Sequence, residues 1–351
     1  MAPLTTFHIG GPARYFVEAR TETEVKEAVH YAADHNLSLF VLGGGSNVLV
    51  ADEGWPGLLL KISLAGVEFD NASRDVIFYA GAGENWDDFV ALTIAKNCAG
   101  LECLSGIPGT VGGTPVQNVG AYGQEASQAI TRVRVLEIAT GEVRELSNAE
   151  CGFSYRRSIF NTSERGRYIV LEVTYRLREG GEATTEYADV RNFFAAMCRK
   201  PGLQEVRDAV RSIRLSKAML LVRADQDGRS AGSFFKNPLV SAAEADRVEA
   251  LAQRRAPERS MPRYPGADGQ VKLAAAWLVE QAGFHKGYAL GAAAISSKHS
   301  LAIVNRGGAK ACEVIALKDA IQKKVFDLWG VHLELEPVFV GFAQSSGMSC
   351  K

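Results

Sequence analysis

The sequence predicts an α+β protein built from several units, and three observations lead to this prediction. Strand and helix patterns alternate between residues 16 and 94, the stretch 131–178 is rich in strand patterns, and two strongly amphipathic helices dominate residues 218–329. The chain has 351 residues, of which 47% are hydrophobic and 23% are charged. This length and composition are typical of two or three globular domains, each with its own core.

The first unit is expected over residues 1–67. Strands are predicted at 16–19, at 39–42 with 48–50 as its resumption, and at 58–62. After the first strand, Thr21 and Glu24 have the spacing of a capping box, in which each residue satisfies a backbone N–H of the other at a helix start. A helix with Val25, Ala28, Val29 and Ala32 on one face is therefore expected to follow.

The second unit is expected over residues 68–217. It opens with a strand at 76–80, and Asn85 is placed to cap a helix whose apolar residues recur at helical spacing. Further strands are predicted at 133–136 and 168–173. The mostly polar stretch 199–217 reads as a helix that leads into the next unit.

The third unit is expected over residues 218–329 and contains two helices. One includes Leu273, Trp277 and Leu278, and the other begins near Lys310 and stops at Gly330, a residue type that favours helix C-termini. A terminal strand is predicted over 333–340, in the C-terminal segment 330–351.

The composition argues against several classes of protein. A formal net charge of −1 lacks the basic excess that nucleic-acid or membrane-surface binding needs. We find neither a secretory signal nor an apolar run of 18 residues, so a cytoplasmic protein is expected. The six cysteines show no metal-ligand spacing; they are expected to be reduced thiols, and no metal is predicted.

The segment Gly43-Gly44-Gly45-Ser46-Asn47 lies between two apolar strands. Glycines allow backbone N–H groups to approach a ligand closely, and several converging amides can hold a pyrophosphate. The segment is not a Rossmann fingerprint, because Val48 occupies the third glycine position, and it lacks the Gly-Lys-Ser/Thr of a P-loop. Taken alone, it is also compatible with a tight structural turn.

A second glycine-rich segment, 106–123, contains six glycines and two prolines in 18 residues, interleaved with apolar residues rather than charges. A solvent loop would be more polar, so an ordered and largely buried loop around a flat or charged ligand fits better. A glycine-rich corner between two sheets remains the alternative.

Seven sequence blocks in order resemble the UDP-N-acetylenolpyruvoylglucosamine reductase (MurB) family. They are Gly-Gly-Gly-Ser-Asn-Val-Leu-Val, Gly-Ala-Gly-Glu-Asn-Trp, Ile-Pro-Gly-Thr-Val-Gly-Gly, Gln-Asn-Val-Gly-Ala-Tyr-Gly, Phe-Ser-Tyr-Arg-Arg-Ser-Ile-Phe, Gly-Ser-Phe-Phe-Lys-Asn-Pro and Leu-Glu-Leu-Glu-Pro-Val. The resemblance extends from about residue 4 to residue 341, and it implies that the C-terminal segment 330–351 returns to the first unit near the active site. The resemblance implies a vanillyl-alcohol-oxidase/PCMH-type FAD-binding domain in two parts, followed by a separate α+β substrate-binding domain.

The resemblance also implies the reaction. Non-covalent FAD takes hydride from NADPH as co-substrate and reduces the enolpyruvyl group of UDP-N-acetylglucosamine enolpyruvate to UDP-N-acetylmuramate, a peptidoglycan precursor. No nucleic-acid or membrane partner is implied, and a monomer is expected. The cofactor-binding residues that it implies are Gly43, Gly44, Gly45, Ser46, Asn47, Ile107, Pro108, Gly109, Gly112, Gly113, Thr114, Gln117, Asn118, Gly120, Ala121 and Tyr122.

Three catalytic residues follow from the same resemblance. Hydride addition to the vinyl group leaves negative charge on the substrate, and Arg156 matches the arginine that stabilises this enolate. Ser233 matches the proton donor, although a serine hydroxyl is a weak acid that a neighbouring group must polarise. Glu336 matches a carboxyl group that orients the substrate or acts as an acid.

Six further residues match substrate-side positions of the family: Tyr187, Lys217, Asn237, Tyr264, Lys272 and His299. Lys217 and Lys272 are suitable point-charge partners for a phosphate or carboxylate. Tyr187 matches the tyrosine that contacts the diphosphate in members with an additional substrate-clamping loop.

Two other functions remain possible at this point. The chain could be another FAD-dependent oxidoreductase of the same fold that acts on a sugar or an alcohol. Such enzymes often tether FAD through histidine or cysteine, and neither residue occurs in the glycine-rich segments. A non-catalytic UDP-sugar-binding protein is the other alternative, but binding alone would not require Arg156, Ser233 and Glu336 together.

Overall fold

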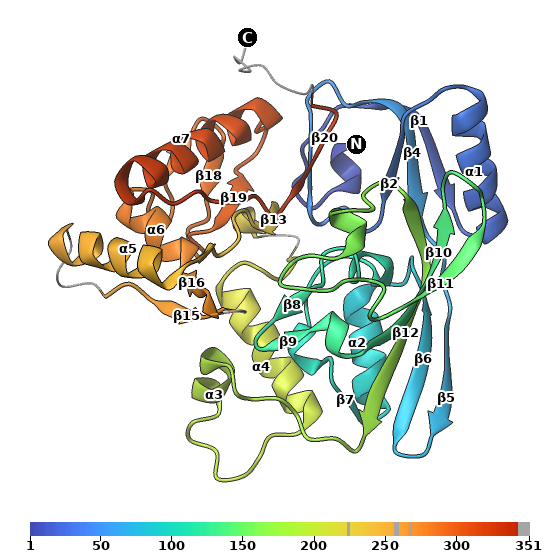
Figure 1. The fold of residues 1–351 in the computed structure, drawn as a ribbon, viewed down its shortest axis with the longest axis horizontal. Coiled ribbons are helices and arrows are strands. Elements are labelled where there is room, and N and C mark those ends of the chain that lie inside the picture. Colours follow the sequence, from blue (N-terminus) through green and yellow to red (C-terminus); the bar gives the residue numbers. More distant parts are fainter. Residues whose placement is uncertain (223–224, 256–259, 267–268, 343–351) are drawn as a thin grey trace. The chain divides into compact units, whose positions relative to one another are not determined.

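The computed structural model describes residues 1–222, 225–255, 260–266 and 269–342, and the contacts within the chain divide it into two units (Figure 1). Unit 1 combines Met1–Pro12, Ser46–Gly54 and the residues from Leu221 onward. Unit 2 combines Ala13–Gly45 and Trp55–Leu220. The chain therefore passes from unit 2 to unit 1 directly after Gly45, inside the first glycine-rich segment.

A three-stranded parallel sheet forms the first part of unit 2. Its order is β1 (Ala13–Ala19), β4 (Trp55–Ile62) and β2 (Leu39–Leu42). Helix α1 (Glu22–Asp34) follows β1 and packs against β1 and β4 (Figure 1). The predicted capping box is confirmed, because the Thr21 hydroxyl accepts from the Glu24 N–H at 3.2 Å and the Glu24 carboxylate accepts from the Thr21 N–H at 3.1 Å.

An antiparallel sheet forms the second part of unit 2. Its strands, in spatial order, are β11 (Val143–Ser147), β10 (Ile130–Glu137), β12 (Tyr168–Glu179), β6 (Asp75–Gly81) and β5 (Val67–Ala72), with β7 (Cys98–Ala99) paired to the end of β12. Buried and half-buried residues alternate along β6, as expected for a strand with one face on the core.

Helix α2 (Trp86–Ala95) supplies the core of this second part. It begins at Asn85, whose side chain accepts from the Asp88 N–H at 3.1 Å, so the predicted cap is confirmed. The rings of Trp86 and Phe89 pack on Tyr175 with centroids 5.9 and 5.0 Å apart. Burying Phe89 alone contributes about 1.5–3 kcal/mol to the free energy of unfolding.

The remaining elements described in unit 2 are short, except for helix α4. They are α3 (Ala188–Phe193), α4 (Leu203–Ser216), β8 (Gly120–Ala121), β9 (Gln124–Glu125) and the 3-10 turns η2 (Glu102–Leu104), η3 (Val111–Gly113), η4 (Ala126–Gln128) and η5 (Ile159–Asn161). Helix α4 lies within the stretch 199–217 that was predicted to be helical, and it contacts α2 and η2.

The described residues of unit 1 form three small sheets. Strand β3 (Val48–Val50) pairs in parallel with β20 (Val338–Val340); a second sheet has the order β13 (Ser230–Ser233), β19 (Ala302–Asn305), β18 (Ala293–Ile295) and β17 (Ala289–Leu290); a third has the order β14 (Leu239–Val240), β16 (Val271–Leu273) and β15 (Arg263–Pro265). The 3-10 turns η1 (Ala2–Leu4) and η6 (Gln226–Gly228) complete the extended part of the unit.

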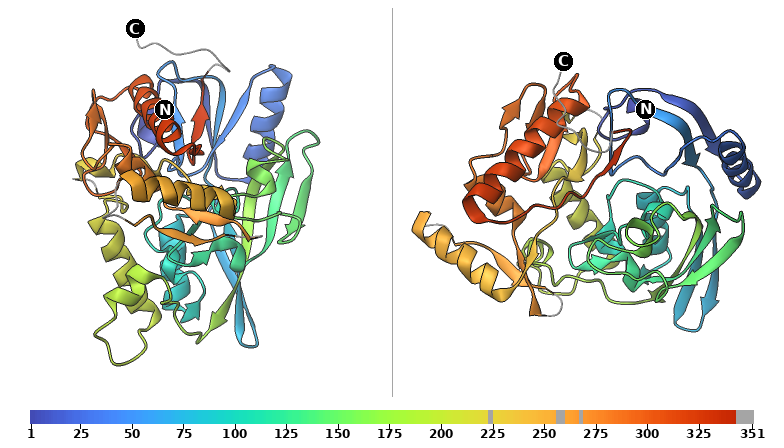
Figure 2. Two further views of the ribbon diagram at one scale, coloured as in Figure 1. Left: turned by 60° about the vertical axis from the view of Figure 1, so that its left-hand side comes forward. Right: turned by 45° about the horizontal axis from the view of Figure 1, so that its top comes forward.

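The described residues of unit 1 also form the helices α5 (Ala242–Arg255), α6 (Ala275–Gln281) and α7 (Ala311–Trp329). Helix α7 packs against α6 and β18 (Figure 2), and its buried stripe includes Val314, Leu317 and Ile321. It ends at Gly330 with φ 66°, which confirms the predicted glycine stop. Among the described residues, no helix combines the length and the apolar character that crossing a bilayer requires.

Three local predictions were wrong in detail. Leu273 was placed in a helix but lies in β16, because its N–H bonds to Pro238 across the small sheet and α6 starts only at Ala275. Residues 48–50 do not resume β2: they pair with β20 in unit 1. The terminal strand is shorter than 333–340, because the residues before β20 bond instead to the chain around Phe234.

The cysteines are not all reduced thiols. Cys98, Cys103 and Cys151 are free and buried, and Cys198 is free and exposed. Cys312 is disulfide-bonded, so the prediction of a reduced thiol is wrong for this residue. Cys350 lies outside the described residues.

Candidate active site

The glycines of the first segment touch the second glycine-rich segment inside unit 2. A Cβ added to Gly44 would lie 2.5 Å from the Cα of Gly109, and one added to Gly43 would lie 2.8 Å from the hydroxyl oxygen of Thr110. Contacts below 3 Å are essentially never tolerated by real Cβ atoms, so only glycine fits at Gly44 opposite this backbone. The close approach shows that the two segments pack on each other and that glycine is required where they meet.

Thr110 is a residue that the sequence analysis did not select. Its hydroxyl oxygen is buried, and it has no hydrogen-bond partner among the described residues. Leaving a buried hydroxyl unpaired costs about 1–3 kcal/mol, so such a group normally has a partner. An oxygen-rich ligand beside this segment, such as the pyrophosphate of FAD, would supply that partner. The position of Thr110 inside the Ile-Pro-Gly-Thr block was the sequence signal that could have identified this residue.

The second glycine-rich segment is bound to the start of α2 by backbone hydrogen bonds. The Trp86 N–H donates to the Gly109 carbonyl at 3.2 Å, and the Val111 N–H donates to the Glu84 carbonyl at 2.9 Å. At Gly112 an added Cβ would lie 2.6 Å from the Cβ of Ala82, whereas at Gly113 it would meet nothing within 4 Å. Gly113 therefore borders open space, while its neighbours are fixed.

The next part of this segment is fixed by Asn118. This residue is fully buried and has φ 45°, a left-handed conformation that asparagine tolerates better than most residues. Its amide nitrogen donates to the Glu125 carboxylate at 2.8 Å and to the Ser154 carbonyl at 3.1 Å. The bond to Ser154 connects the predicted cofactor loop to the hairpin that carries Arg156.

Arg156 lies at the tip of a tight hairpin in unit 2. The Ser154 and Arg157 backbones exchange two hydrogen bonds of 3.0 Å, and Arg156 between them has φ 58°. The Nη2 atom of Arg156 donates to the Gly120 carbonyl at 2.5 Å, and its own carbonyl accepts from the Asn161 amide at 3.1 Å. The structure therefore brings the predicted catalytic arginine onto the predicted cofactor-binding segment.

Two predicted substrate residues lie beside Tyr122 in unit 2. The rings of Tyr122 and Tyr187 meet edge to face with centroids 5.5 Å apart, and the Lys217 ammonium is 5.9 Å from the Tyr122 ring centroid. Lys217 also pairs with Asp189 at 2.6 Å. Burial opposes the charge of Lys217, but the bond to Asp189 and the electrostatic influence of the neighbouring side chains together outweigh it and raise the pKa of Lys217. The lysine is a cation at neutral pH.

Unit 1 brings together Ser233, Glu336 and Asn47. Ser233 ends β13, and the next residue, Phe234, accepts a 3.0 Å hydrogen bond at its carbonyl from the Glu336 N–H. The Asn47 amide donates to the Glu336 carbonyl at 3.2 Å, and the Asn47 carbonyl accepts from Val338 at 2.9 Å. These hydrogen bonds therefore hold Asn47, Glu336 and the neighbour of Ser233 together, although the three positions are far apart in sequence.

The other predicted substrate residues of unit 1 lie on two sheets. Tyr264 and Lys272 are directly paired on β15 and β16, and Tyr264 is exposed. The Asn237 side-chain oxygen accepts from the Ala275 N–H at 3.0 Å, so it caps the start of α6. His299 lies before β19, and its Nδ1 accepts from the Leu301 N–H at 3.1 Å. For Asn237 and His299, one polar atom of each side chain already has a structural role.

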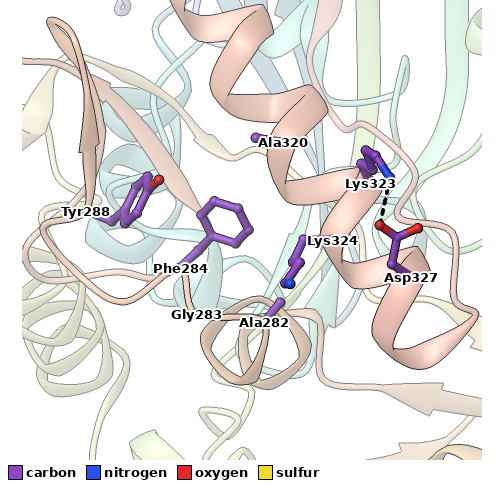
Figure 3. Close-up of a pocket in the computed structure, with 8 residues that line it drawn as sticks. All are labelled: Ala282, Gly283, Phe284, Tyr288, Ala320, Lys323, Lys324 and Asp327. Carbon is purple, nitrogen blue, oxygen red and sulfur yellow. Dashed lines mark hydrogen bonds and ion pairs between the residues drawn. The ribbon is translucent and has the colours of Figure 1, made fainter.

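A hollow of about 370 Å³ lies elsewhere in unit 1, between the C-terminal half of α7 and the loop after α6 (Figure 3). Phe284 and Tyr288 from the loop and Lys324 from α7 line it, and Lys323 pairs with Asp327 on its α7 side at 2.8 Å. None of the predicted site residues lines this hollow. We assign it no part in the reaction.

Comparison with known proteins agrees with this geometry. Residues 13–147 match the FAD binding domain family, and residues 224–340 match the C-terminal domain of UDP-N-acetylenolpyruvoylglucosamine reductase. The reductase of Thermobifida fusca is 44% identical over 97% of this chain and 96% of its own length. That of Streptomyces avermitilis is 42% identical over 97% and 93%.

A solved structure gives the same result. The UDP-N-acetylenolpyruvylglucosamine reductase (MurB) of Thermus caldophilus matches 97% of this chain and 96% of its own chain, with a TM-score of 0.66 and 26% identity. An FAD-binding domain followed by a separate C-terminal domain defines the protein as a flavin-dependent oxidoreductase of α+β fold, as predicted. The chain belongs to the UDP-N-acetylenolpyruvoylglucosamine reductase family.

Proposed function

We propose that this protein uses NADPH and non-covalently bound FAD to reduce UDP-N-acetylglucosamine enolpyruvate to UDP-N-acetylmuramate, a step of peptidoglycan precursor synthesis. The observation that carries the proposal is the contact of Arg156 with Gly120, which connects a guanidinium to the glycine segment suited to FAD. The reductases of Thermobifida fusca and Streptomyces avermitilis, which match nearly the whole chain, support the assignment of substrate.

The FAD-binding role is proposed for the two glycine-rich segments. Gly43, Gly44 and Gly109 leave the backbone bare where a pyrophosphate would lie, and the Thr110 hydroxyl offers it a hydrogen bond. When bound, FAD supplies the hydride-transfer chemistry that no side chain can provide. The other members of the site are the predicted residues of the segments 45–47, 107–108, 112–114, 117–118 and 120–122.

Arg156 is proposed to stabilise the negative charge that develops on the substrate. Hydride addition to the terminal vinyl carbon leaves charge on the neighbouring carbon and its carboxylate, and a cation held in position lowers the barrier more than mobile water can. The hairpin hydrogen bonds and the bond to Gly120 hold this guanidinium before substrate arrives. The arginine therefore acts through electrostatics and moves no proton.

Ser233 is proposed to donate the proton that completes the reduction, and Glu336 to orient this step. The hydrogen bond between the Glu336 N–H and the Phe234 carbonyl keeps the two residues in register. A serine hydroxyl donates only when charge has built up on the acceptor carbon, so protonation follows hydride addition. Glu336, whose backbone is also held by Asn47, restricts the orientation of the group that is protonated.

The substrate-binding role is proposed for Tyr187 and Lys217 in unit 2 and for Asn237, Tyr264, Lys272 and His299 in unit 1. Lys217 carries a positive charge beside Tyr122 and Tyr187, as a diphosphate ligand would require. The division into two FAD-binding parts, 1–67 with 330–351 and 68–217, and a substrate-binding domain, 218–329, belongs to the same proposal. So do a monomeric state, a cytoplasmic location, and the absence of nucleic-acid and membrane partners.

A stopped-flow experiment tests the proposed function. Purified protein should be yellow and should release its flavin on denaturation. FAD absorbance should bleach when NADPH is added and return when the UDP-enolpyruvyl sugar follows. Flavin that stays attached after denaturation, or absorbance that returns only with oxygen, would favour a different oxidase. A colourless protein that does not bind added FAD would remove the proposal.

A further inference from the structure

Gly106, the first residue of the second glycine-rich segment, is held at its N–H by a side chain of α2. The Asp87 carboxylate accepts from the Gly106 N–H at 2.6 Å. Gly106 has φ +73°, and a Cβ at this position would lie 2.9 Å from a methyl group of Leu220. The turn at Gly106 therefore needs glycine, and the direction in which the backbone leaves the turn depends on Asp87.

The carbonyl of the same residue is held from the opposite side by α4. The Arg214 Nε donates to the Gly106 carbonyl at 3.0 Å, and its Nη2 donates to the Met219 carbonyl at 2.6 Å. Arg214 is 6% exposed, so its guanidinium has little access to water. Both polar groups of the Gly106 backbone are thus bound to charged side chains.

Asp87 also joins α4 to α2. Its carboxylate accepts from Arg207 at 2.6 Å and from Arg211, and its side chain is 22% exposed. Burial pushes the pKa of Asp87 upward, but the bonds from Arg207 and from the Gly106 N–H outweigh it and hold the pKa below its usual value. The carboxylate is therefore ionised at neutral pH and balances two guanidinium groups.

The stretch that begins at Gly106 continues directly to Gly109, where the second glycine-rich segment contacts the first. Only two residues separate Gly106 from Gly109, which lies against Gly44. The Trp86 N–H, next to Asp87, binds the Gly109 carbonyl, so the start of α2 fixes both ends of the stretch 106–109. A change in the Gly106 turn would therefore shift the backbone at Gly109.

We propose that Asp87 is a positioning residue for the FAD-binding loop, which it holds through Gly106, Arg207 and Arg211. The proposal rests on the proposed placement of FAD at the two glycine-rich segments. Asp87 does not contact the cofactor itself; it fixes the turn from which residues 107–109 reach the other glycine segment. The competing role is an ordinary ion pair that holds α2 to α4 and leaves FAD binding unaffected.

Glu137 offers a matched control in the same unit. Its carboxylate also joins two arginines, Arg144 at 2.7 Å and Arg167 at 2.8 Å, and its side chain is 7% exposed. It lies on β10 and bonds to no residue of either glycine-rich segment. Asp87→Ala and Asp87→Asn should be compared with Glu137→Ala and Glu137→Gln. All four remove a carboxylate that is shared by two arginines.

The experiment measures FAD release from the purified holoenzymes by the rise of flavin fluorescence on dilution, together with urea unfolding. Loss of a charge-assisted bond predicts that Asp87→Ala releases FAD about tenfold faster or more. Asp87→Asn, which retains an oxygen for the Gly106 N–H, should show a smaller acceleration. The Glu137 variants should lose stability but release FAD at the parent rate.

Each outcome decides the question. Parent-like FAD release from both Asp87 variants would overturn the proposal, as would equal acceleration in the Glu137 variants, because general destabilisation would then explain the effect. If Asp87→Ala does not fold, Asp87→Asn decides alone: faster release supports the role and the parent rate removes it. A parent protein that carries no FAD would instead contradict the proposed function and is recognised before any variant is made.

Discussion

The guanidinium of Arg156 donates a hydrogen bond to the backbone carbonyl of Gly120 at 2.5 Å, across 36 positions of sequence. Arg156 also has a left-handed backbone, φ 58°, which costs a residue other than glycine about 1–2 kcal/mol. The bond to Gly120 and the bond from Asn161 to the Arg156 carbonyl offset that strain. A conformation that is strained and held in place in this way is typical of residues at functional sites.

Replacing Arg156 by lysine should impair only the half-reaction that consumes the UDP-sugar. Lysine keeps a charge but loses the planar group that reaches Gly120, so transition-state stabilisation should fall by about 3 kcal/mol, or on the order of a hundredfold in rate. Stopped-flow absorbance should show NADPH reducing the flavin at the parent rate. It should also show slow reoxidation by the UDP-enolpyruvyl sugar.

Arg157 is the control for this substitution, because it lies in the same hairpin and has no assigned role in the reaction. Arg157→Lys should leave both half-reactions close to the parent rates. Equal slowing of reoxidation in the two variants would mean that the hairpin fold, rather than the Arg156 guanidinium, is responsible. Unchanged reoxidation in Arg156→Lys would remove Arg156 from the mechanism.

Ser233→Ala should also separate the two half-reactions. Removing the proton donor leaves hydride transfer from NADPH to flavin intact, whereas the reduced flavin should be reoxidised slowly by the UDP-sugar. Ser230→Ala, three residues earlier in β13, is the comparison, since its hydroxyl accepts from the Gly232 N–H at 3.2 Å and no role in the reaction is proposed for it. Similar losses in both half-reactions for Ser233→Ala would argue for a structural role of the serine.

The elements that the sequence predicted well are those whose signals are local. The capping box of α1, the Asn85 cap of α2 and the glycine stop of α7 each depend on residues within one or two helical turns. Residues 48–50 were misassigned because an apolar strand pattern does not say which sheet it joins. Their partner, β20, follows almost 300 residues later.

The same distinction applies to the site. Motif blocks predicted Arg156 and the glycine segments, and the structure shows that Arg156, the second segment and the glycines of the first lie together in unit 2. Asp87 could not be selected from the sequence, because its partners lie 19 positions away at Gly106 and 120 positions away at Arg207. A single aspartate at the start of a helix is ordinarily explained by the helix dipole alone.

Two glycines allow the proposed FAD cradle to be tested by adding one methyl group. Gly113→Ala adds a Cβ that meets no protein atom within 4 Å, and Gly113 does not need a positive φ. Its free energy of unfolding without cofactor should change by less than about 1 kcal/mol. If FAD occupies the adjoining space, the dissociation constant for FAD should nevertheless rise, as measured by fluorescence titration.

Gly44→Ala is the counterpart, since its Cβ would lie 2.5 Å from the Gly109 backbone. Overpacking of this kind should lower the free energy of unfolding by about 1–3 kcal/mol and should weaken FAD binding as well. Parent-like FAD affinity in Gly113→Ala would mean that the cofactor does not approach this glycine. A stable, fully flavinated Gly44→Ala would contradict the close packing of the two segments.

The buried thiols of Cys103 and Cys151 should lower the free energy of unfolding at alkaline pH. Burial, with the neighbouring Glu102 and Glu150 carboxylates, raises the pKa of Cys103 and of Cys151 from 9.0 to about 12. The folded state therefore keeps both protons at a pH where the unfolded chain releases them. Their contribution to stability is complete below pH 9 and is lost as the pH rises from 9 towards 12.

One pH unit above the unfolded pKa, each thiol should remove about 1.4 kcal/mol from the free energy of unfolding. Urea titrations at a series of alkaline pH values measure this slope. Cys103→Ala should flatten it by the share of one thiol, because the Cys103 thiol, which donates to the Thr184 carbonyl at 3.3 Å, is then absent. Cys198→Ala, which removes an exposed thiol instead of a buried one, is the control and should leave the slope unchanged. If the slope in Cys103→Ala equalled that of the parent, the Cys103 thiol would not be the group that stays protonated in the folded chain.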